Sequence, residues 1–413
     1  GLGRLAACYL DSMTTLDIPA TGYSICYELG IFKQKIVDGQ QVELPDDWLN
    51  LGDAWLMPKP QEAEEVHFGG KVRTRWDNGH LMVVHEDYTR VLAIPCDMLV
   101  AGYNTDHVNT LRLWDAKSPK PIDMQLFSQG QYLKANEERA MADSISTILY
   151  PEDNHYEGKS LRLKQQYFFV SATLQSITRQ HIQTYGTLTN FHEKNVIQIN
   201  DTHPTMIIPE LIRILVEDKA FTMDEAIEVV SKCCAYTNHT ILAEALEKWP
   251  LKYLEKVVPQ LVPYIKELDK RVAAKYKDPK VQIIDKDGRV HMAHIDIHYG
   301  FSVNGVAAIH TEILKNTELN AFYRLYPEKF NNKTNGITFR RWLMSCNREL
   351  STYLAQTIGD GFKKDADKLE KLLEFKDNPE VLDQIAQIKM NRKQELVAYV
   401  KENEGVTLNP DSI

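Results

Sequence analysis

Cysteine is scarce and scattered in this sequence. The 413 residues include six cysteines, and no two of them form a Cys-x-x-Cys pair. This spacing suggests neither a zinc ribbon nor a disulfide framework. We therefore expect reduced thiols and a cytoplasmic protein. The sequence also lacks an apolar run long enough to cross a bilayer, and no signal peptide stands at its start.

Positive charge is outweighed as well. The 48 Lys and Arg residues face 57 Asp and Glu residues, which leaves a formal net charge of −9. That balance argues against nucleic acid as the main partner. Neither a Gly-x-Ser-x-Gly nucleophile motif nor a Walker phosphate loop is present. The hydrophobic content of 43% and the charged content of 25% are those of an ordinary globular protein.

Both ends of the sequence resemble cuts in a longer chain. It begins at Gly1 in a glycine-rich turn without an initiator Met, and it stops in a turn at 409–413. We therefore expect a fragment of a longer protein. Gly1, Gly3 and Ala6 match a G-x-G-x-x-A dinucleotide pattern, but no strand precedes them. A glycine turn that lets the backbone approach a ligand is the better interpretation.

Two clusters of polar side chains follow strand-like runs. The first is Asn200-Asp-Thr-His-Pro204, which precedes a helical pattern at 206–216. The second is Thr237-Asn-His-Thr240, which precedes a helical pattern at 241–249. In an open α/β sheet, ligands bind beyond the carboxyl ends of the strands, where helix N-termini expose free N–H groups. We predict that one cleft is faced by Asp201, His203, Asn238 and His239.

Helix capping is the alternative interpretation of both clusters. Asp201 or Thr202 could cap the first helix, and Asn238 or Thr240 the second. One capping residue suffices for a helix, whereas each cluster holds several polar side chains. The repetition at two junctions favours function.

Local signals predict further helices and strands. Thr222-Met-Asp-Glu225 is a capping box that opens a helix. Asn378 followed by Pro379 predicts the start of a helix that ends near Gly405. Short antiparallel strands are expected between residues 26 and 113. The change of character after Asn335 predicts a domain boundary, with an α/β domain at 1–335 and the helical start of a second domain at 336–413.

Two further groups of side chains are candidates for a functional site. His294, Asp296 and His298 alternate along what we interpret as a strand, so that they would share one face and could hold a divalent metal. The alternative, a solvated strand face, is favoured because the intervening residues are apolar and no fourth ligand is evident. Arg340-Arg341-Trp342 could serve a phosphate and a planar ring, or could simply start a helix.

Taken as a set, the segments resemble the α-glucan phosphorylases, the glycogen and maltodextrin enzymes. The glycine loop and first helix at 1–13 are similar to those of the family. Further similar segments, in family order, are Gly30–Lys35, Val108–Trp114, Leu149–Asn154, Leu161–Gln165, Asn200–Pro204, Ala235–Thr240, Val303–Val306 and Asn332–Thr338. They are distributed over nearly the whole chain.

The resemblance implies a fold and an activity. The fold is α/β and glycosyltransferase-B-like, with a Rossmann-like N-terminal domain and the first helices of a second domain. The activity is the transfer of a terminal glucosyl unit from an α-1,4-glucan to inorganic phosphate, with retention, which gives glucose 1-phosphate. The implied cofactor is pyridoxal 5'-phosphate, whose phosphate group donates and accepts the proton. A homodimer is implied for the parent protein, with no nucleic acid and no membrane as partners.

The resemblance also implies roles for single residues. Carried over by motif, His239 contacts the sugar and stabilises developing positive charge, and Asn335 binds a sugar hydroxyl. Gly1 and Leu2 form the loop beside the glucosyl and phosphate groups. Substrate-binding positions are Asn154, Asp201, His203 and Val306, the second and third of these at the acceptor subsite. Trp342 forms a wall of the cofactor pocket.

Some features depart from the family pattern. The lysine that forms the Schiff base is absent from the 413 residues, so we expect this piece alone to be inactive. Arg179 is followed by Gln180 where animal enzymes have a second Arg, which argues against nucleotide activation. The segment His294-Ile-Asp-Ile-His298 also departs. The alternative functions are a non-catalytic glucan-binding fragment and a metal-dependent hydrolase built on His294, Asp296 and His298.

Overall fold

The computed structural model describes residues 1–50, 52–218 and 220–412. The chain forms two compact units. Unit 1 comprises Gly1–Gly22, Leu99–Thr110 and Gly336–Ile413, and unit 2 comprises Tyr23–Met98 and Leu111–Asn335. The predicted division into domains 1–335 and 336–413 concerns the full-length protein and stays a prediction.

A first sheet is built from the N-terminal half of the chain. Its strand order is β1 (Thr21–Ile25), β9 (Val108–Lys117), β8 (Thr89–Ala101) and β4 (Met57–Pro58), and β5 (Glu64–Phe68) also pairs with β8. The pairs β4–β8 and β5–β8 are antiparallel, as the sequence predicts for this region. Helix α5 (Tyr156–Tyr185) packs on β5, and its Thr173 accepts a hydrogen bond from the buried indole of Trp114.

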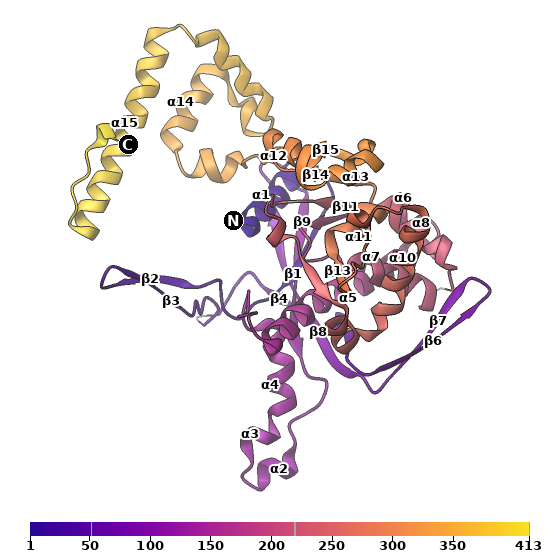
Figure 1. Ribbon diagram of the computed structural model, residues 1–413. Helices are drawn as coiled ribbons and strands as arrows, with labels where there is room; N and C mark the ends of the chain where they lie inside the picture. Colours follow the sequence, from indigo (N-terminus) through magenta and orange to yellow (C-terminus); the bar gives the residue numbers. More distant parts are fainter. Residues whose placement is uncertain (51, 219, 413) are drawn as a thin grey trace. The chain divides into compact units, whose positions relative to one another are not determined.

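Two hairpins extend away from the body of unit 2 (Figure 1). They are β2 (Lys33–Val37) with β3 (Gln40–Leu44), and β6 (Lys71–Asp77) with β7 (His80–Glu86). Each turn has two residues, Asp38-Gly39 or Asn78-Gly79, and all four have positive φ angles. Asp-Gly and Asn-Gly are the residue pairs that tight hairpin turns of this kind prefer.

A second sheet carries the polar clusters of the sequence. It consists of four parallel strands in the order β10 (Ile197–Asn200), β11 (Cys234–Thr237), β14 (Ser302–Gly305) and β15 (Phe330–Asn332). Helices α7 (Ile207–Arg213), α8 (Met223–Cys233), α11 (Met292–Tyr299) and α12 (Ala308–Ile313) pack around this sheet and on one another. All four strands point the same way, so their carboxyl ends share one edge. The mixed α/β prediction is confirmed.

The remaining helices of unit 2 are shorter than α5. They are α2 (Met124–Ser128), α3 (Tyr132–Ala135), α4 (Glu137–Asp143), α6 (Phe191–Lys194), α9 (Leu251–Val257), α10 (Val262–Lys275) and α13 (Asn320–Leu325). Two short strands, β12 (Lys248–Pro250) and β13 (Arg289–His291), pair antiparallel. The capping box at Thr222 is confirmed: its hydroxyl accepts from the backbone of Glu225, whose carboxylate accepts from the backbone of Thr222.

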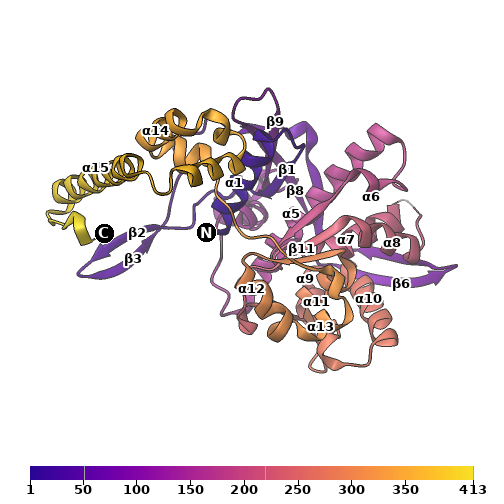
Figure 2. The same cartoon turned by 90° about the horizontal axis from the view of Figure 1, so that it is seen from above.

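Unit 1 is helical in its C-terminal part. Helix α1 (Leu2–Thr15) begins directly after Gly1. Helices α14 (Arg348–Ile358) and α15 (Pro379–Glu404) lie side by side (Figures 1 and 2). The predicted start of α15 is confirmed, since the Asn378 side chain accepts from two backbone N–H groups. The helix ends at Gly405, whose φ of 71° suits glycine.

Two predictions about secondary structure are wrong. Residues 241–249 do not form a helix; they hold a short 3-10 turn at Ala243–Ala245 and then strand β12. The side chains of Asn238 and Thr240 accept hydrogen bonds from backbone N–H groups two residues on, which turns the chain away from a helical path.

The second wrong prediction concerns His294, Asp296 and His298, which lie on helix α11 and not on a strand. This helix is buried on nearly every side. Its sequence therefore shows no amphipathic period of 3.6 residues, and the alternation over five residues mimicked a strand.

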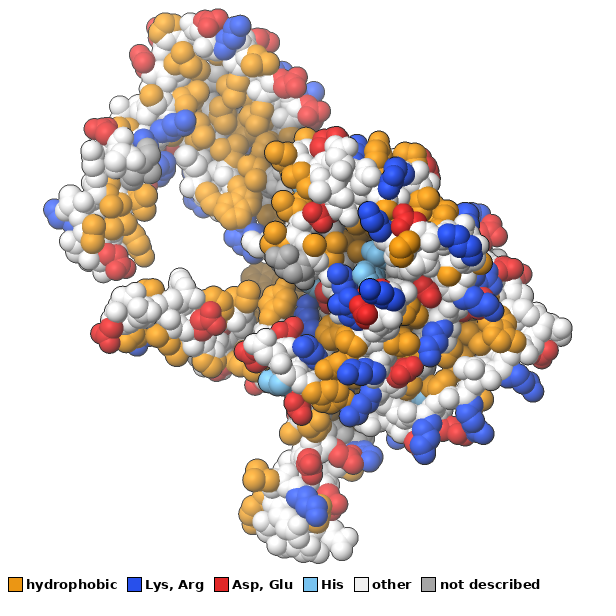
Figure 3. All heavy atoms as spheres, viewed as in Figure 1, with side chains coloured by type: hydrophobic (Ala, Val, Ile, Leu, Met, Phe, Trp, Pro, Cys, Tyr) orange, Lys and Arg blue, Asp and Glu red, His pale blue; other side chains and the backbone are white. Residues whose placement is uncertain are grey.

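Some apolar side chains stay on the surface of unit 2. They are visible on hairpin β2–β3 and on the arm formed by α2, α3 and α4 (Figure 3). Exposed examples on these elements are Ile36, Val37, Val42, Leu44, Met124, Tyr132 and Leu133. No helix among the described residues is both long and apolar enough to span a membrane.

Candidate active site at the ends of parallel strands

The first polar cluster follows β10. Asp201 has a φ of 63°, a left-handed conformation that is uncommon for residues other than glycine. Its backbone N–H donates to the carbonyl of Thr237 at the end of the neighbouring strand, at 3.0 Å. The turn therefore joins the ends of β10 and β11. Helix α7 begins several residues later, at Ile207, so its N-terminus lies just beyond this turn.

The carboxyl group of Asp201 is buried and only partly satisfied. The residue is 9% exposed, and its Oδ1 has no hydrogen-bond partner among the described residues. Burial raises the pKa of Asp201, while the nearby imidazoles of His203 and His239 oppose this rise. An unpaired buried acceptor is costly, and a ligand hydroxyl is one group that would satisfy it.

The second polar cluster follows β11 and is held by a buried amide. Asn238 is fully buried; its Nδ2 donates to the Tyr236 hydroxyl at 3.0 Å, and its Oδ1 accepts from the backbone of Thr240. His310 Nε2 lies 3.1 Å from the same Oδ1, while its Nδ1 accepts from the backbone of Val306. These contacts make Nδ1 of His310 an acceptor and Nε2 the donor to Asn238, so Asn238 is a structural residue that shapes the loop.

His239 connects the two clusters. Its Nε2 lies 2.6 Å from Oδ1 of Asn200, so the imidazole spans the ends of β10 and β11. Because an amide oxygen only accepts, Nε2 carries the proton and Nδ1 has a free lone pair. Burial lowers the pKa of His239, and His310 and His203 lower it further, whereas Asp201 raises it. The ring is thus neutral at pH 7. The structure brings His239, Asp201 and His203 together, as the sequence predicts.

Glu247 is a site residue that the sequence did not reveal. Its carboxylate accepts from Thr202 at 2.9 Å and Gln166 at 2.8 Å, and its Oε1 lies 3.7 Å from His203 Nε2. It therefore holds Thr202 of the first polar cluster in place and lies close to His203. The sequence does not reveal Glu247, because the helical pattern at 241–249 predicts a charged side chain that is solvated.

Two other predicted site residues of unit 2, Asn335 and Asn154, lie on exposed loops. Asn335 is exposed, and its backbone N–H donates to the carbonyl of Val306 at 2.9 Å. Asn154 is also exposed, and its amide donates to the carboxylate of Glu152. The pairing of Asn335 with Val306 places these two predicted residues together beyond β14 and β15.

Gly1, Leu2 and Trp342 belong to unit 1. Gly1 is exposed at the start of α1, and Leu2 is half-buried in its first turn. The Trp342 indole is 46% exposed, and its N–H lies 3.4 Å from the Cys8 sulfur on α1. One edge of the indole is thus fixed while much of its face stays free. A planar heteroaromatic ring could pack against such a face.

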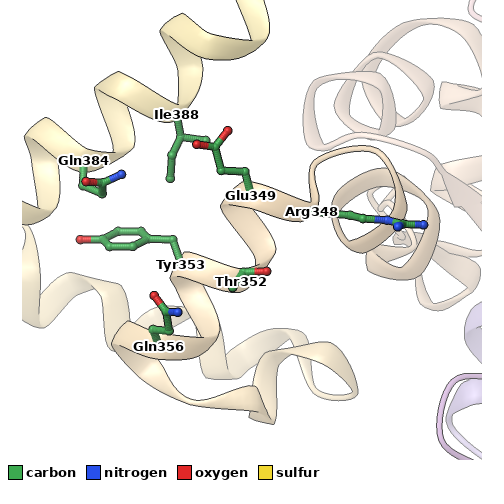
Figure 4. A pocket seen from close by; sticks show the side chains of 7 residues that line it. All are labelled: Arg348, Glu349, Thr352, Tyr353, Gln356, Gln384 and Ile388. Atoms are coloured by element: carbon green, nitrogen blue, oxygen red, sulfur yellow. The ribbon is translucent and has the colours of Figure 1, made fainter.

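A pocket of about 360 Å³ also lies in unit 1, between α14 and α15 (Figure 4). Tyr353 and Gln356 of α14 face Gln384 and Ile388 of α15 across it. The described residues that line it include none of the predicted site residues. It is a surface groove between two helices and is separate in sequence from the two polar clusters that follow β10 and β11, which we call the strand-end site.

His294, Asp296 and His298 face different partners. His294 Nδ1 lies 2.6 Å from the carbonyl of Gln282, and His298 lies between the Val281 carbonyl and the Tyr326 hydroxyl. Burial lowers the pKa of His294 to about 3 and that of His298 to about 4, so both rings are neutral at pH 7. Among the described residues, no group of three His, Cys, Asp or Glu side chains could hold a metal ion.

Gly158 leaves room for the close approach of the loop that carries Asn154. It lies in the first turn of α5, where an added Cβ would stand 1.6 Å from the backbone oxygen of Glu152. We expect Gly158→Ala to displace this loop and to lower the free energy of unfolding by about 1–3 kcal/mol, measured by chemical denaturation. The matched control is Gly3→Ala in the first turn of α1, where a Cβ meets nothing within 4 Å. A loss no larger for Gly158→Ala than for Gly3→Ala would refute this reading of the loop.

Comparisons with known proteins agree with the resemblance. The chain matches the carbohydrate phosphorylase family over residues 1–413. It is 48% identical over 413 residues to maltodextrin phosphorylase of Streptococcus pneumoniae and 45% identical over 432 aligned residues to the muscle form of glycogen phosphorylase of Oryctolagus cuniculus. All of this chain but only 51% of each relative is covered, so the chain spans about half the length of these proteins. The mixed α/β architecture is consistent with the glycosyltransferase-B-like N-terminal region of a phosphorylase. The chain belongs to the carbohydrate phosphorylase family.

Proposed function

We propose that the full-length protein containing this chain is an α-glucan phosphorylase. It transfers a terminal α-1,4-linked glucosyl unit to inorganic phosphate, with retention, and releases glucose 1-phosphate. The observation that carries the proposal is the strand-end site, where a neutral imidazole and a buried, unpaired carboxylate oxygen stand together. Neutral sugars are bound by hydrogen bonds of this kind. The similarity to a maltodextrin phosphorylase and to glycogen phosphorylases supports the same substrate class.

In this proposal the strand-end residues act on the glucosyl unit. His239 contacts the sugar and stabilises the positive charge that develops at the reacting carbon. Asn335 holds a sugar hydroxyl, and the loop at Gly1 and Leu2 lies beside the glucosyl and phosphate groups. Further contacts to the glucan come from Asn154, Asp201, His203 and Val306. Asp201 suits this task because its unpaired Oδ1 can accept from a hydroxyl.

The cofactor in the proposal is pyridoxal 5'-phosphate, which supplies a phosphate group that donates and accepts a proton. Of the residues in this chain, Trp342 fits that group, because its exposed indole face can pack on a planar pyridine ring. From the family pattern, we expect that the lysine that binds pyridoxal 5'-phosphate is not among the 413 residues. We also propose a homodimer, for which the exposed apolar side chains of α2, α3 and hairpin β2–β3 offer contact surface.

The test is an assay of the full-length protein with maltoheptaose and with glycogen. We expect release of glucose 1-phosphate that depends on inorganic phosphate and on bound pyridoxal 5'-phosphate. Comparing the two glucans establishes the preferred substrate. Binding of glucan without any phosphorolysis would instead identify a non-catalytic glucan-binding protein.

A further inference from the structure

Asp296 on α11 is a buried acid without a charged partner. The residue has no exposed surface, and its Oδ2 accepts a hydrogen bond from the Thr205 hydroxyl at 2.5 Å. Its Oδ1 has no hydrogen-bond partner among the described residues. Thr205 directly follows the first polar cluster, so this hydrogen bond joins α11 to the turn that carries Asp201 and His203.

The surroundings of Asp296 disfavour a negative charge. In the part of the chain that the structure describes, no Lys or Arg acts on its charge. The ionisable groups that act on it from neighbouring elements are Asp201 in the turn and Glu247 before β12, and both are acidic. Cys234 and Tyr236 of β11 also lie close. The neighbouring Cys233 thiol and burial raise the pKa of Cys234, and burial raises the pKa of Tyr236, so both are neutral at pH 7. The two histidines of α11 itself are neutral as well.

A buried carboxylate in this environment would be an uncompensated charge. Such a group ordinarily takes up a proton, since moving an unpaired charge out of water costs far more than protonation does. Burial raises the pKa of Asp296, the Thr205 hydrogen bond opposes the rise, and the repulsion from Asp201 and Glu247 adds to it. A neutral carboxyl group also tolerates a free Oδ1 better than a carboxylate would.

We propose that Asp296 is an uncharged positioning residue that ties helix α11 to the 200–205 turn through Thr205 and thereby fixes the place of Asp201 and His203. It touches neither substrate nor cofactor in this account. Its influence on turnover rests on the proposed phosphorylase function. Its protonation and its effect on stability do not.

The stability test compares Asp296→Asn with the wild type in the full-length protein. The proposed Asp296 keeps its proton in the folded state but loses it in the unfolded state. The free energy of unfolding therefore falls as pH rises from the unfolded pKa toward the folded pKa. We therefore expect wild type to lose stability relative to Asp296→Asn between pH 5 and pH 8, by up to roughly tenfold in the folding equilibrium constant per pH unit. Asn is isosteric and cannot ionise, so it lacks this loss.

Asp285→Asn is the matched control. Burial raises the pKa of Asp285, but hydrogen bonds from His291 and from backbone N–H groups outweigh it and hold the pKa at about 2. This carboxylate stabilises the fold at every pH above its unfolded pKa. Asp285→Asn should therefore destabilise the protein at every pH between 5 and 8, whereas the stability of Asp296→Asn relative to wild type should rise toward pH 8.

An infrared measurement reads the proton directly. The difference between the infrared spectra of wild type and Asp296→Asn at pH 7 should show the carbonyl stretch of one protonated carboxylic acid. The difference is needed because burial also raises the pKa of Glu64, to about 7. In Thr205→Val the band should shift but persist, which keeps the proposal testable if Asp296→Asn folds poorly. The absence of an acid band from this difference spectrum, or a pH-independent destabilisation by Asp296→Asn, would overturn the proposal.

The positioning role is tested by turnover with rescue. Asp296→Ala should lower kcat/KM by about tenfold or more, because it frees the turn that carries His203. Asp296→Asn should keep kcat/KM within about twofold of wild type. It should also move the loss of kcat/KM on the alkaline side of the pH profile to higher pH. Equal losses in both variants would refute positioning by a neutral group. If the wild type shows no phosphorolysis, the proposed function fails, while the infrared and stability results still decide the state of Asp296.

Discussion

His239→Ala in the full-length protein is expected to lower kcat by a factor on the order of 10² or more, with a much smaller change in KM. Such a factor corresponds to about 2.7 kcal/mol of transition-state stabilisation. The imidazole is neutral, and its Nε2 lies 2.6 Å from Oδ1 of Asn200. The ring is therefore held in place and can stabilise positive charge that develops in the reaction. A contact that strengthens only in the transition state affects kcat and not binding. Steady-state kinetics with maltoheptaose and phosphate measures both constants.

Two companion variants separate chemistry from architecture. His239→Gln retains an amide N–H that can donate to Asn200, so it preserves the link between β10 and β11 without the imidazole. Asn200→Ala removes the acceptor and leaves the ring. If His239→Gln restores turnover, or if His239→Ala changes only KM, His239 is a binding or structural residue and the catalytic assignment fails.

The sequence predicted the features that depend on local chemistry. The helix starts at Thr222 and Asn378 are set by side chains that bond to the backbone two or three residues on, so a short segment suffices to reveal them. The meeting of Asp201 and His239 also follows from sequence, because parallel strands present their carboxyl ends at one edge of a sheet.

The predictions that failed concern features that depend on residues far away in the sequence. Strand β12 exists because β13, some forty residues later, pairs with it, and nothing in residues 241–249 encodes that pairing. Helix α11 is buried on nearly every side by other parts of unit 2, so its own sequence carries no amphipathic period. The role of Glu247 depends on Thr202 and Gln166, which lie far from it in sequence, and so it was visible only in three dimensions.

Glu210→Ala is expected to produce the largest loss of stability, about 3–5 kcal/mol in the free energy of unfolding. Glu210 lies on α7, just after the first polar cluster, and its side chain is fully buried. Its two oxygens accept from Nε and Nη2 of Arg213, from the hydroxyl of Tyr167 and from that of Ser171, at 2.7 to 3.0 Å. Removing the carboxylate leaves Nε and Nη2 of Arg213 and two hydroxyl donors of α5 without their acceptor. Only the partly exposed Glu217 then pairs with the Arg213 charge. Urea denaturation of variant and wild type measures the loss.

Two further variants show whether the loss comes from the stranded charge. Glu217→Ala removes the other carboxylate bound to Arg213, but that side chain is 21% exposed, so water can replace it and the loss should be smaller. Glu210→Leu combined with Arg213→Met removes both charges and keeps similar volume, and it should recover most of the stability. A loss below about 1 kcal/mol for Glu210→Ala would contradict the argument. Because Glu210 fastens α7 to α5 and reaches none of the strand-end side chains itself, kcat of the folded fraction should stay near wild type, which distinguishes this variant from His239→Ala.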